Sequence, residues 1–227
     1  MNIFLDIETI PAQPEEATKE EIRSSIQAPA TMKKAETIQE WHEGKGKYAG
    51  VKDVAVEKAY RDTSFNGAKG QVCSIAWIVD GVLDSVSTDG KSEEEVLRYF
   101  FGSISRAGRD RPPFFIGHYV AGFDLKFLFH RAIILGVNFS AIPNFKLPFD
   151  GRHGKDYYCT QAAWAGFNGK ISQDNLCKGL GIEGKPGDID GSKVWDFVKA
   201  GDIKRVEEYN RHDAETVEKI YKRLNFR

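Results

Sequence analysis

The sequence predicts a mixed α/β fold with a central sheet flanked by helices, and three observations support this prediction. An apolar strand stands at the N-terminus, an apolar hairpin pattern occupies residues 71–87, and amphipathic helices and a further strand follow up to a long C-terminal helix. Strands and helices in this order are typical of a sheet covered by helices. We therefore expect a single domain over residues 1–227, with an inserted polar and helical elaboration at about residues 11–68.

The N-terminal strand combines an apolar run with two acidic residues. Four apolar residues lead into Asp6-Ile7-Glu8, and alternate side chains of a strand point to opposite faces. Asp6 and Glu8 therefore share one face, while Ile7 points into the protein. Two neighbouring carboxylates repel each other unless one is protonated or a cation lies between them. Taken alone, an Asp-x-Glu pair is more typical of a solvated strand end.

Residues 11–68 are polar and mixed in charge, with few apolar anchors. Helix-forming residues cover Glu15–Ile26, Ile38 and Trp41 indicate a second short helix, and Val54–Arg61 indicate a third. A surface elaboration without a role is the simpler interpretation of this insertion. A lid over a binding site is the alternative.

The hairpin and the helix after it have clear boundary signals. Gln71–Val79 is apolar and β-rich, Asp80-Gly81 is a two-residue turn, and Val82–Ser87 forms the returning strand. We expect the N-terminal strand to lie beside this pair. Ser92 then caps a helix whose first turn is acidic.

The second half of the chain continues as a short strand followed by helices. Phe114–Gly117 predicts a buried strand, after which a helix begins at Asp124. A further strand is predicted at Asp156–Thr160. Helices are then expected from the Ser172 cap to Leu180, from Ser192 onward, and from Gly201-Asp202 to about Leu224. Residues 184–191 are predicted to form a loop.

Composition limits the possible partners and location. The formal net charge is -1, with 41% hydrophobic and 29% charged residues, so any nucleic-acid contact must come from local patches or from metal-bridged phosphates. The sequence shows no signal peptide and no membrane-spanning stretch, and its three cysteines lack metal-type spacing. These features predict a cytoplasmic protein that acts as a monomer.

The C-terminal helix places a phenol and a carboxylate on one face. Tyr209 and Asp213 are four residues apart, so both side chains can reach the same point. Alone, such a pair is more often a core tyrosine and a surface acid. Together with Asp6, Glu8 and Asp124, it gives four acids at three separated positions and one hydroxyl.

This ordered set of motifs resembles the DEDD exonuclease superfamily, which has a ribonuclease H-like fold. Asp6-x-Glu8 resembles the first motif of the superfamily, and Phe123-Asp124 resembles the second. Tyr209-x3-Asp213 resembles the third motif as it occurs in the tyrosine subclass. The histidine subclass has a histidine five positions before the last aspartate, where this chain has Glu208. The resemblance is strongest to predicted exonucleases related to the proofreading domain of family B DNA polymerases, which also contain a segment like 191–195.

The resemblance implies a 3′–5′ exonuclease that uses two divalent cations, Mg²⁺ or Mn²⁺. Asp6 would bridge both ions, Glu8 and Asp213 would complete the ion on the nucleophile side, and Asp124 would hold the ion on the leaving-group side. Tyr209 would orient the attacking water, because a phenol with a pKa near 10 is a poor base at neutral pH. Two-ion hydrolysis would release nucleoside monophosphates from the 3′ end of DNA, most simply a single strand.

The chain departs from the family at one position of the second motif. The family has an asparagine shortly before Phe-Asp, and this chain has Tyr119 there. A tyrosine at this position either stacks on a base or serves as a packing aromatic. The residues expected to contact substrate are Thr9, Ile10, His118, Tyr119, Phe123 and Lys185.

Two other functions remain compatible with the sequence. One is a 3′–5′ exoribonuclease of the same superfamily, because no motif visibly senses a 2′-hydroxyl group. The other is a catalytically silent module that binds nucleic acid, a possibility raised by Tyr119. A silent module gains nothing from concentrating carboxylates beside phosphate, and it should bind DNA without a divalent cation.

Overall fold

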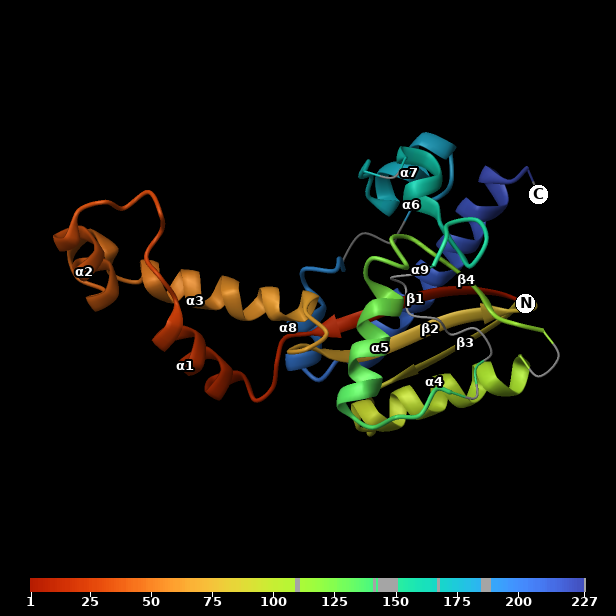
Figure 1. Ribbon diagram of the computed structural model, residues 1–227, viewed down its shortest axis with the longest axis horizontal. Helices are drawn as coiled ribbons and strands as arrows, with labels where there is room; N and C mark the ends of the chain where they lie inside the picture. The colour runs from red at the N-terminus through yellow and green to blue at the C-terminus, as the bar shows by residue number, and fades with distance from the viewer. Residues whose placement is uncertain (109–110, 141, 143–150, 167, 185–188, 227) are drawn as a thin grey trace. The chain divides into compact units, whose positions relative to one another are not determined.

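The computed structural model describes residues 1–108, 111–140, 142, 151–166, 168–184 and 189–226 (Figure 1). The chain forms two compact units. The first comprises residues 1–9 and 72–227, and the second comprises residues 10–71. The polar insertion expected at residues 11–68 falls inside the second unit.

A five-stranded sheet forms the centre of the first unit. Its strand order is β3 (Val82–Ser87), β2 (Gln71–Val79), β1 (Asn2–Ile10), β4 (Phe114–Gly117) and β5 (Tyr157–Cys159). The predicted hairpin is confirmed: β2 and β3 are antiparallel, and both turn residues, Asp80 and Gly81, have positive φ. β1 lies next to β2 and pairs in parallel with β4, which pairs in parallel with β5.

Side chains alternate along β1 between the face of the sheet covered by α4 (Glu93–Ala107) and α5 (Asp124–Ile134) and the face covered by α9 (Ile203–Leu224). Ile3, Leu5 and Ile7 join the large cluster that the sheet forms with α4 and α5. On the opposite face, Phe4 packs with Val217 and Tyr221 of α9. Asp6 and Glu8 have the parity of Phe4, so they point to the face that α9 covers.

Helix α4 begins with the predicted cap. Ser92 and Glu95 form a reciprocal capping box, in which each side chain accepts from the backbone N–H of the other. Glu93, in the same turn, accepts two hydrogen bonds from Arg131 of α5, at 2.8 and 2.7 Å, and one from the backbone of Val72. This ion pair is buried and joins α4, α5 and the start of β2.

Three short helices precede α9: α6 (Thr160–Ala165), α7 (Gln173–Leu180) and α8 (Val194–Lys199). The α7 prediction is confirmed, with Ser172 as N-cap and Gly181 in the left-handed conformation at the C-cap. The strand predicted up to Thr160 ends one residue earlier, because α6 begins there and Cys159 Sγ accepts from the backbone of Ala162. Residues 185–188 of the predicted loop lie outside the described residues.

The second unit is helical, with three helices and two 3₁₀ turns in order: α1 (Glu15–Ser25), α2 (Ala35–Glu43), η1 (Gly46–Tyr48), α3 (Val51–Asp62) and η2 (Thr63–Phe65). Lys19 of α1 forms ion pairs with Glu15 and with Glu57 of α3, which tie these two helices together. Trp41 of α2 is buried. Within the described parts of the chain, no helix has the length and apolarity needed to cross a membrane.

Replacing Arg131 with methionine should lower the free energy of unfolding by about 3–5 kcal/mol, because Glu93 would keep its charge in a buried place without its partner. Denaturant unfolding followed by circular dichroism measures this change. Arg98→Met is the matched control, since Arg98 pairs with Glu94 in the exposed part of α4. The control should lose less than about 1 kcal/mol. Equal losses in the two variants would contradict the role given to the buried pair.

Candidate active site

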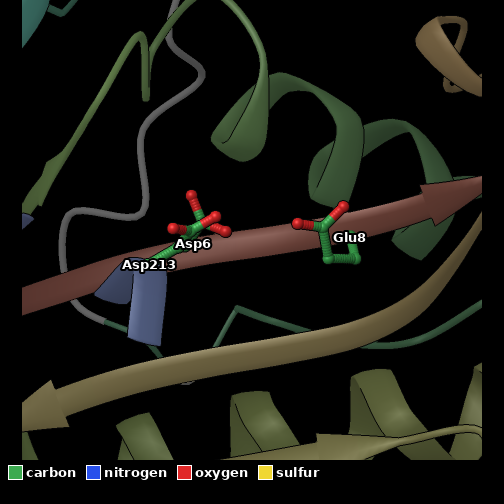
Figure 2. A group of neighbouring side chains, drawn as sticks. All are labelled: Asp6, Glu8 and Asp213. Atoms are coloured by element: carbon green, nitrogen blue, oxygen red, sulfur yellow. The ribbon is translucent and has the colours of Figure 1, made fainter. Parts of the chain in front are cut away.

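Three carboxylates from two elements meet on the face of the sheet beneath α9. Asp6 and Glu8 come from β1, and Asp213 comes from α9. One oxygen atom of each lies within 4.8 Å of the others. Figure 2 shows the carboxylate groups of Asp6 and Asp213 side by side, with Glu8 further along the strand. The structure therefore brings together residues more than 200 positions apart in the sequence.

Packing of α9 explains why Asp213 arrives at this point. Val217 lies one helical turn after Asp213 and is buried against Phe4 of β1, so the same face of α9 carries both residues. The side chain of Gln173, at the start of α7, donates to the backbone carbonyl of Asp213 at 3.2 Å. These two contacts fix the position of the helix turn that holds Asp213.

Asp124 ties the second motif to the first. It is the first residue of α5, is 4% exposed, and its Oδ1 atom accepts from the backbone N–H of Ile7 at 3.2 Å. The ladder between β1 and β4 ends at Phe4 and Ile116, so Asp124 binds β1 beyond the end of that ladder. Asp124 is thus anchored to the residue between Asp6 and Glu8.

Burial controls the protonation of Asp124. Its pKa is raised to about 7, chiefly by desolvation and to a smaller extent by the charge of Asp213, whereas hydrogen bonds from backbone N–H groups oppose the shift. Near neutral pH, the metal-free protein therefore relieves part of the repulsion among the acids by protonating this carboxyl group.

Tyr209 lies beside the three clustered acids. It is buried one turn before Asp213, and its phenol forms a hydrogen bond with that side chain. Burial raises the pKa of Tyr209 well above its usual value, and the nearby charges of Asp213, Glu8 and Asp6 raise it further. The phenol therefore keeps its proton near neutral pH and donates a hydrogen bond to Asp213.

Sequence reasoning missed Asn210, which is part of the site. Its Nδ2 group donates to Oδ2 of Asp6 at 2.7 Å, and the residue is fully buried. The signal available in the sequence was its position in the apolar stripe of the last helix, between Val206 and Ala214. A polar residue inside such a stripe needs a buried hydrogen-bond partner.

The other residues predicted to contact substrate occupy varied environments. Thr9 and Ile10 are buried at the end of β1, and Phe123 is half-buried with its ring 5.5 Å from that of Phe127. The two ring nitrogens of His118 lie 2.9 Å from the hydroxyl of Thr160 and 2.8 Å from the carbonyl of Ile171, so this ring helps to hold the protein together. Lys185 lies outside the described residues.

Tyr119 has an unusual backbone and an exposed ring. Its φ angle is 66°, in the left-handed region that favours glycine and asparagine, and its side chain is 51% exposed. The ring lies directly over Gly122, where an added Cβ atom would stand only 2.3 Å from a ring carbon. The absence of a side chain at Gly122, two residues before Asp124, therefore makes room for the tyrosine ring.

The donor set fits a hard divalent cation. Asp6, Glu8 and Asp213 offer only carboxylate oxygens, which suit Mg²⁺ and Mn²⁺, and the cluster has no cysteine or histidine ligand of the kind that zinc prefers. A cation among the three carboxylates would also neutralise their mutual repulsion.

The sequence matches one family model over residues 71–226, described as the predicted 3′–5′ exonuclease related to the exonuclease domain of PolB. The chain belongs to this family. The matched residues include Asp124, Tyr209 and Asp213, whereas Asp6 and Glu8 precede them. The structure adds the missing part of the acid set by placing β1 beside the matched region.

The fold of this PolB-related exonuclease family member is similar to that of a family B DNA polymerase from the hyperthermophilic archaeon Pyrobaculum calidifontis. The TM-score is 0.59 at 15% sequence identity, and the similarity covers 99% of this chain but 24% of the polymerase. The predicted α/β, ribonuclease H-like fold is thereby confirmed. No curated protein is significantly similar to the chain in sequence.

Replacing Asp124 with asparagine should stabilise the metal-free protein increasingly as the pH rises from about 4 to about 7. In this window Asp124 is ionised in the unfolded chain but keeps its proton in the folded protein. The free energy of unfolding of the unaltered chain therefore falls as the pH rises. The asparagine variant has no proton to lose and escapes this penalty. Urea unfolding in chelator between about pH 5 and pH 8 measures the difference, and a difference that stays constant or shrinks with pH would contradict the assignment.

Proposed function

We propose that this chain is a metal-dependent 3′–5′ exonuclease that hydrolyses the terminal phosphodiester bond of DNA and releases nucleoside monophosphates. The observation that supports this most is the cluster of Asp6, Glu8 and Asp213 within 4.8 Å, with Tyr209 against it, in a member of an exonuclease family.

Two divalent cations would supply the charge that stabilises the attacking and leaving oxygens when they are bound. Asp6, Glu8 and Asp213 would bind the cation on the nucleophile side, and Asp6 would also bind the cation on the leaving-group side. Asp124 would also hold the cation on the leaving-group side. Its buried carboxyl group has a pKa of about 7, so it can ionise near neutral pH when positive charge arrives.

Tyr209 would position the water that attacks the phosphate. Its pKa is raised, so it keeps its proton and can donate to Asp213 while its oxygen accepts from the water. Removal of the water's proton would fall to groups other than this phenol. We therefore assign Tyr209 an orienting role.

The exposed ring of Tyr119 supports a single-stranded substrate. The exposed aromatic ring of Tyr119, held against Gly122 near the start of α5, suits stacking against an unpaired base. Every base has a flat face that can stack in this way. Stacking does not distinguish DNA from RNA, so the preference for DNA follows the family's relation to PolB. Thr9, Ile10, His118, Phe123 and Lys185 stay predicted substrate contacts.

The test incubates the purified chain with 5′-labelled single-stranded DNA or matched RNA, in Mg²⁺, Mn²⁺ or chelator. We expect a ladder that shortens from the 3′ end of DNA only when the cation is present. Asp6→Asn is the control, because it keeps the size of the side chain but removes the bridging charge, and it should reduce the rate at least about a thousandfold.

Other outcomes of this assay would redirect the assignment. Shortening of RNA alone would identify an exoribonuclease. Binding of DNA in chelator without release of nucleotide, in both the unaltered chain and the variant, would identify a silent binding module and sink the proposal.

Tyr119→Ala should weaken binding of single-stranded DNA by about 5- to 150-fold, because base stacking on an aromatic ring contributes about 1–3 kcal/mol. Fluorescence anisotropy with an Asp6→Asn background measures binding without cleavage. Tyr119→Asn, which suits the positive φ, should weaken binding as much while raising thermal stability. Tyr99→Ala is the matched control, since Tyr99 is 45% exposed on α4, which covers the other face of the sheet. Unchanged binding by Tyr119→Ala would exclude the stacking role.

A further inference from the structure

A buried amide links the proposed metal ligands to the sheet. Asn210 follows Tyr209 on α9, and both Asn210 and Ser74 of β2 are fully buried. The Nδ2 group of Asn210 donates to Oδ2 of Asp6 at 2.7 Å. Its Oδ1 atom accepts from the hydroxyl of Ser74 at 2.9 Å. The three side chains therefore form a continuous chain of hydrogen bonds from β2, through α9, to β1.

The chemistry of the three groups fixes the direction of these bonds. An ionised carboxylate only accepts, so the amide of Asn210 must present its NH₂ group to Asp6 and its oxygen to Ser74. The hydroxyl of Ser74 then has to donate. Each polar atom at the two junctions has a hydrogen-bond partner, and a buried network of this kind holds its members in one arrangement.

We infer that Asn210 is a positioning residue, oriented by Ser74, that holds Asp6 in the orientation needed to bind a divalent cation. This inference rests on the proposed function, because it takes Asp6 as a metal ligand. The amide brings a partial positive charge to Asp6 while leaving the cluster's formal charge unchanged. It stabilises the ionised carboxylate beside Glu8 and Asp213 and reduces the reorientation that metal binding would otherwise require.

The hairpin provides a matched comparison for this role. Ser87 of β3 lies directly opposite Ser74 in the ladder and is also buried. Its hydroxyl donates to Glu207 of α9, so it likewise joins the hairpin to the last helix. Ser87 differs from Ser74 because its hydroxyl bonds Glu207, whereas the hydroxyl of Ser74 bonds Asn210, the partner of Asp6. A merely structural role for these contacts predicts the same behaviour for both serines.

The experiment measures Mn²⁺ binding to the full chain by calorimetry and by the electron paramagnetic resonance signal of free Mn²⁺. Asn210→Leu should weaken Mn²⁺ binding by about 10- to 100-fold, the usual effect of removing a hydrogen-bond partner of a metal ligand. Ser74→Ala should weaken it by about two- to tenfold, because the amide loses its orienting bond. Ser87→Ala should leave Mn²⁺ affinity unchanged. Excess Mn²⁺ should restore the nuclease rate of Ser74→Ala.

Each result bears on the inference. If Asn210→Leu fails to fold, the two serine variants decide, because both keep Asn210. Equal Mn²⁺ affinities in Ser74→Ala and Ser87→Ala would overturn the positioning role, as would unchanged affinity in a folded Asn210→Leu. If Mn²⁺ affinity depends on Ser74 and Asn210 but no nucleic acid is degraded, the proposed function fails while the positioning role stands. An unaltered chain that binds no Mn²⁺ would overturn both.

Discussion

The close approach of three carboxylates is the constraint on which the rest of the site depends. Asp6, Glu8 and Asp213 lie within 4.8 Å of one another, where like charges repel strongly in a partly buried setting. The fold holds them there by packing α9 against the face of β1 that carries Phe4, with Val217 as the contact nearest to Asp213. Core burial thus supplies the free energy that keeps the acids together, and their repulsion is available to favour a cation.

Polar contacts around the cluster moderate this repulsion in different ways. Asp124 has a pKa of about 7 and can hold a proton near neutral pH, Tyr209 stays protonated, and Asn210 donates a hydrogen bond to Asp6. The hydrogen bonds of Asp124 to β1 and of Asn210 to Asp6 join acids of the site to other elements, whereas that of Tyr209 to Asp213 lies within α9. The packing of helices and strands that forms the core therefore also positions the groups that surround the acids.

Tyr119 shows how a single position can depart from a family motif while the acidic residues of the motifs are kept. The resemblance predicts asparagine at this position, and asparagine suits the left-handed backbone found there. Tyrosine accepts the same backbone at a cost, with its ring laid over Gly122 and half of its surface exposed. Such costly conformations cluster at functional sites, which is one reason for proposing that Tyr119 contacts substrate.

The sequence alone determined the element order apart from α6, the hairpin at Asp80-Gly81, the Ser92 and Ser172 caps and the family resemblance, because periodicity, turn residues and motif spacing are local signals. It also predicted that Asp6 and Glu8 share a face, which follows from strand geometry. Only the tertiary structure decided that α9 covers this face and delivers Asp213 there. The tertiary structure likewise decided three pairings: Asn210 with Asp6, Ile7 with Asp124, and the His118 ring with Thr160 and Ile171. Each of them joins residues far apart in the chain, and no local pattern encodes such a pairing.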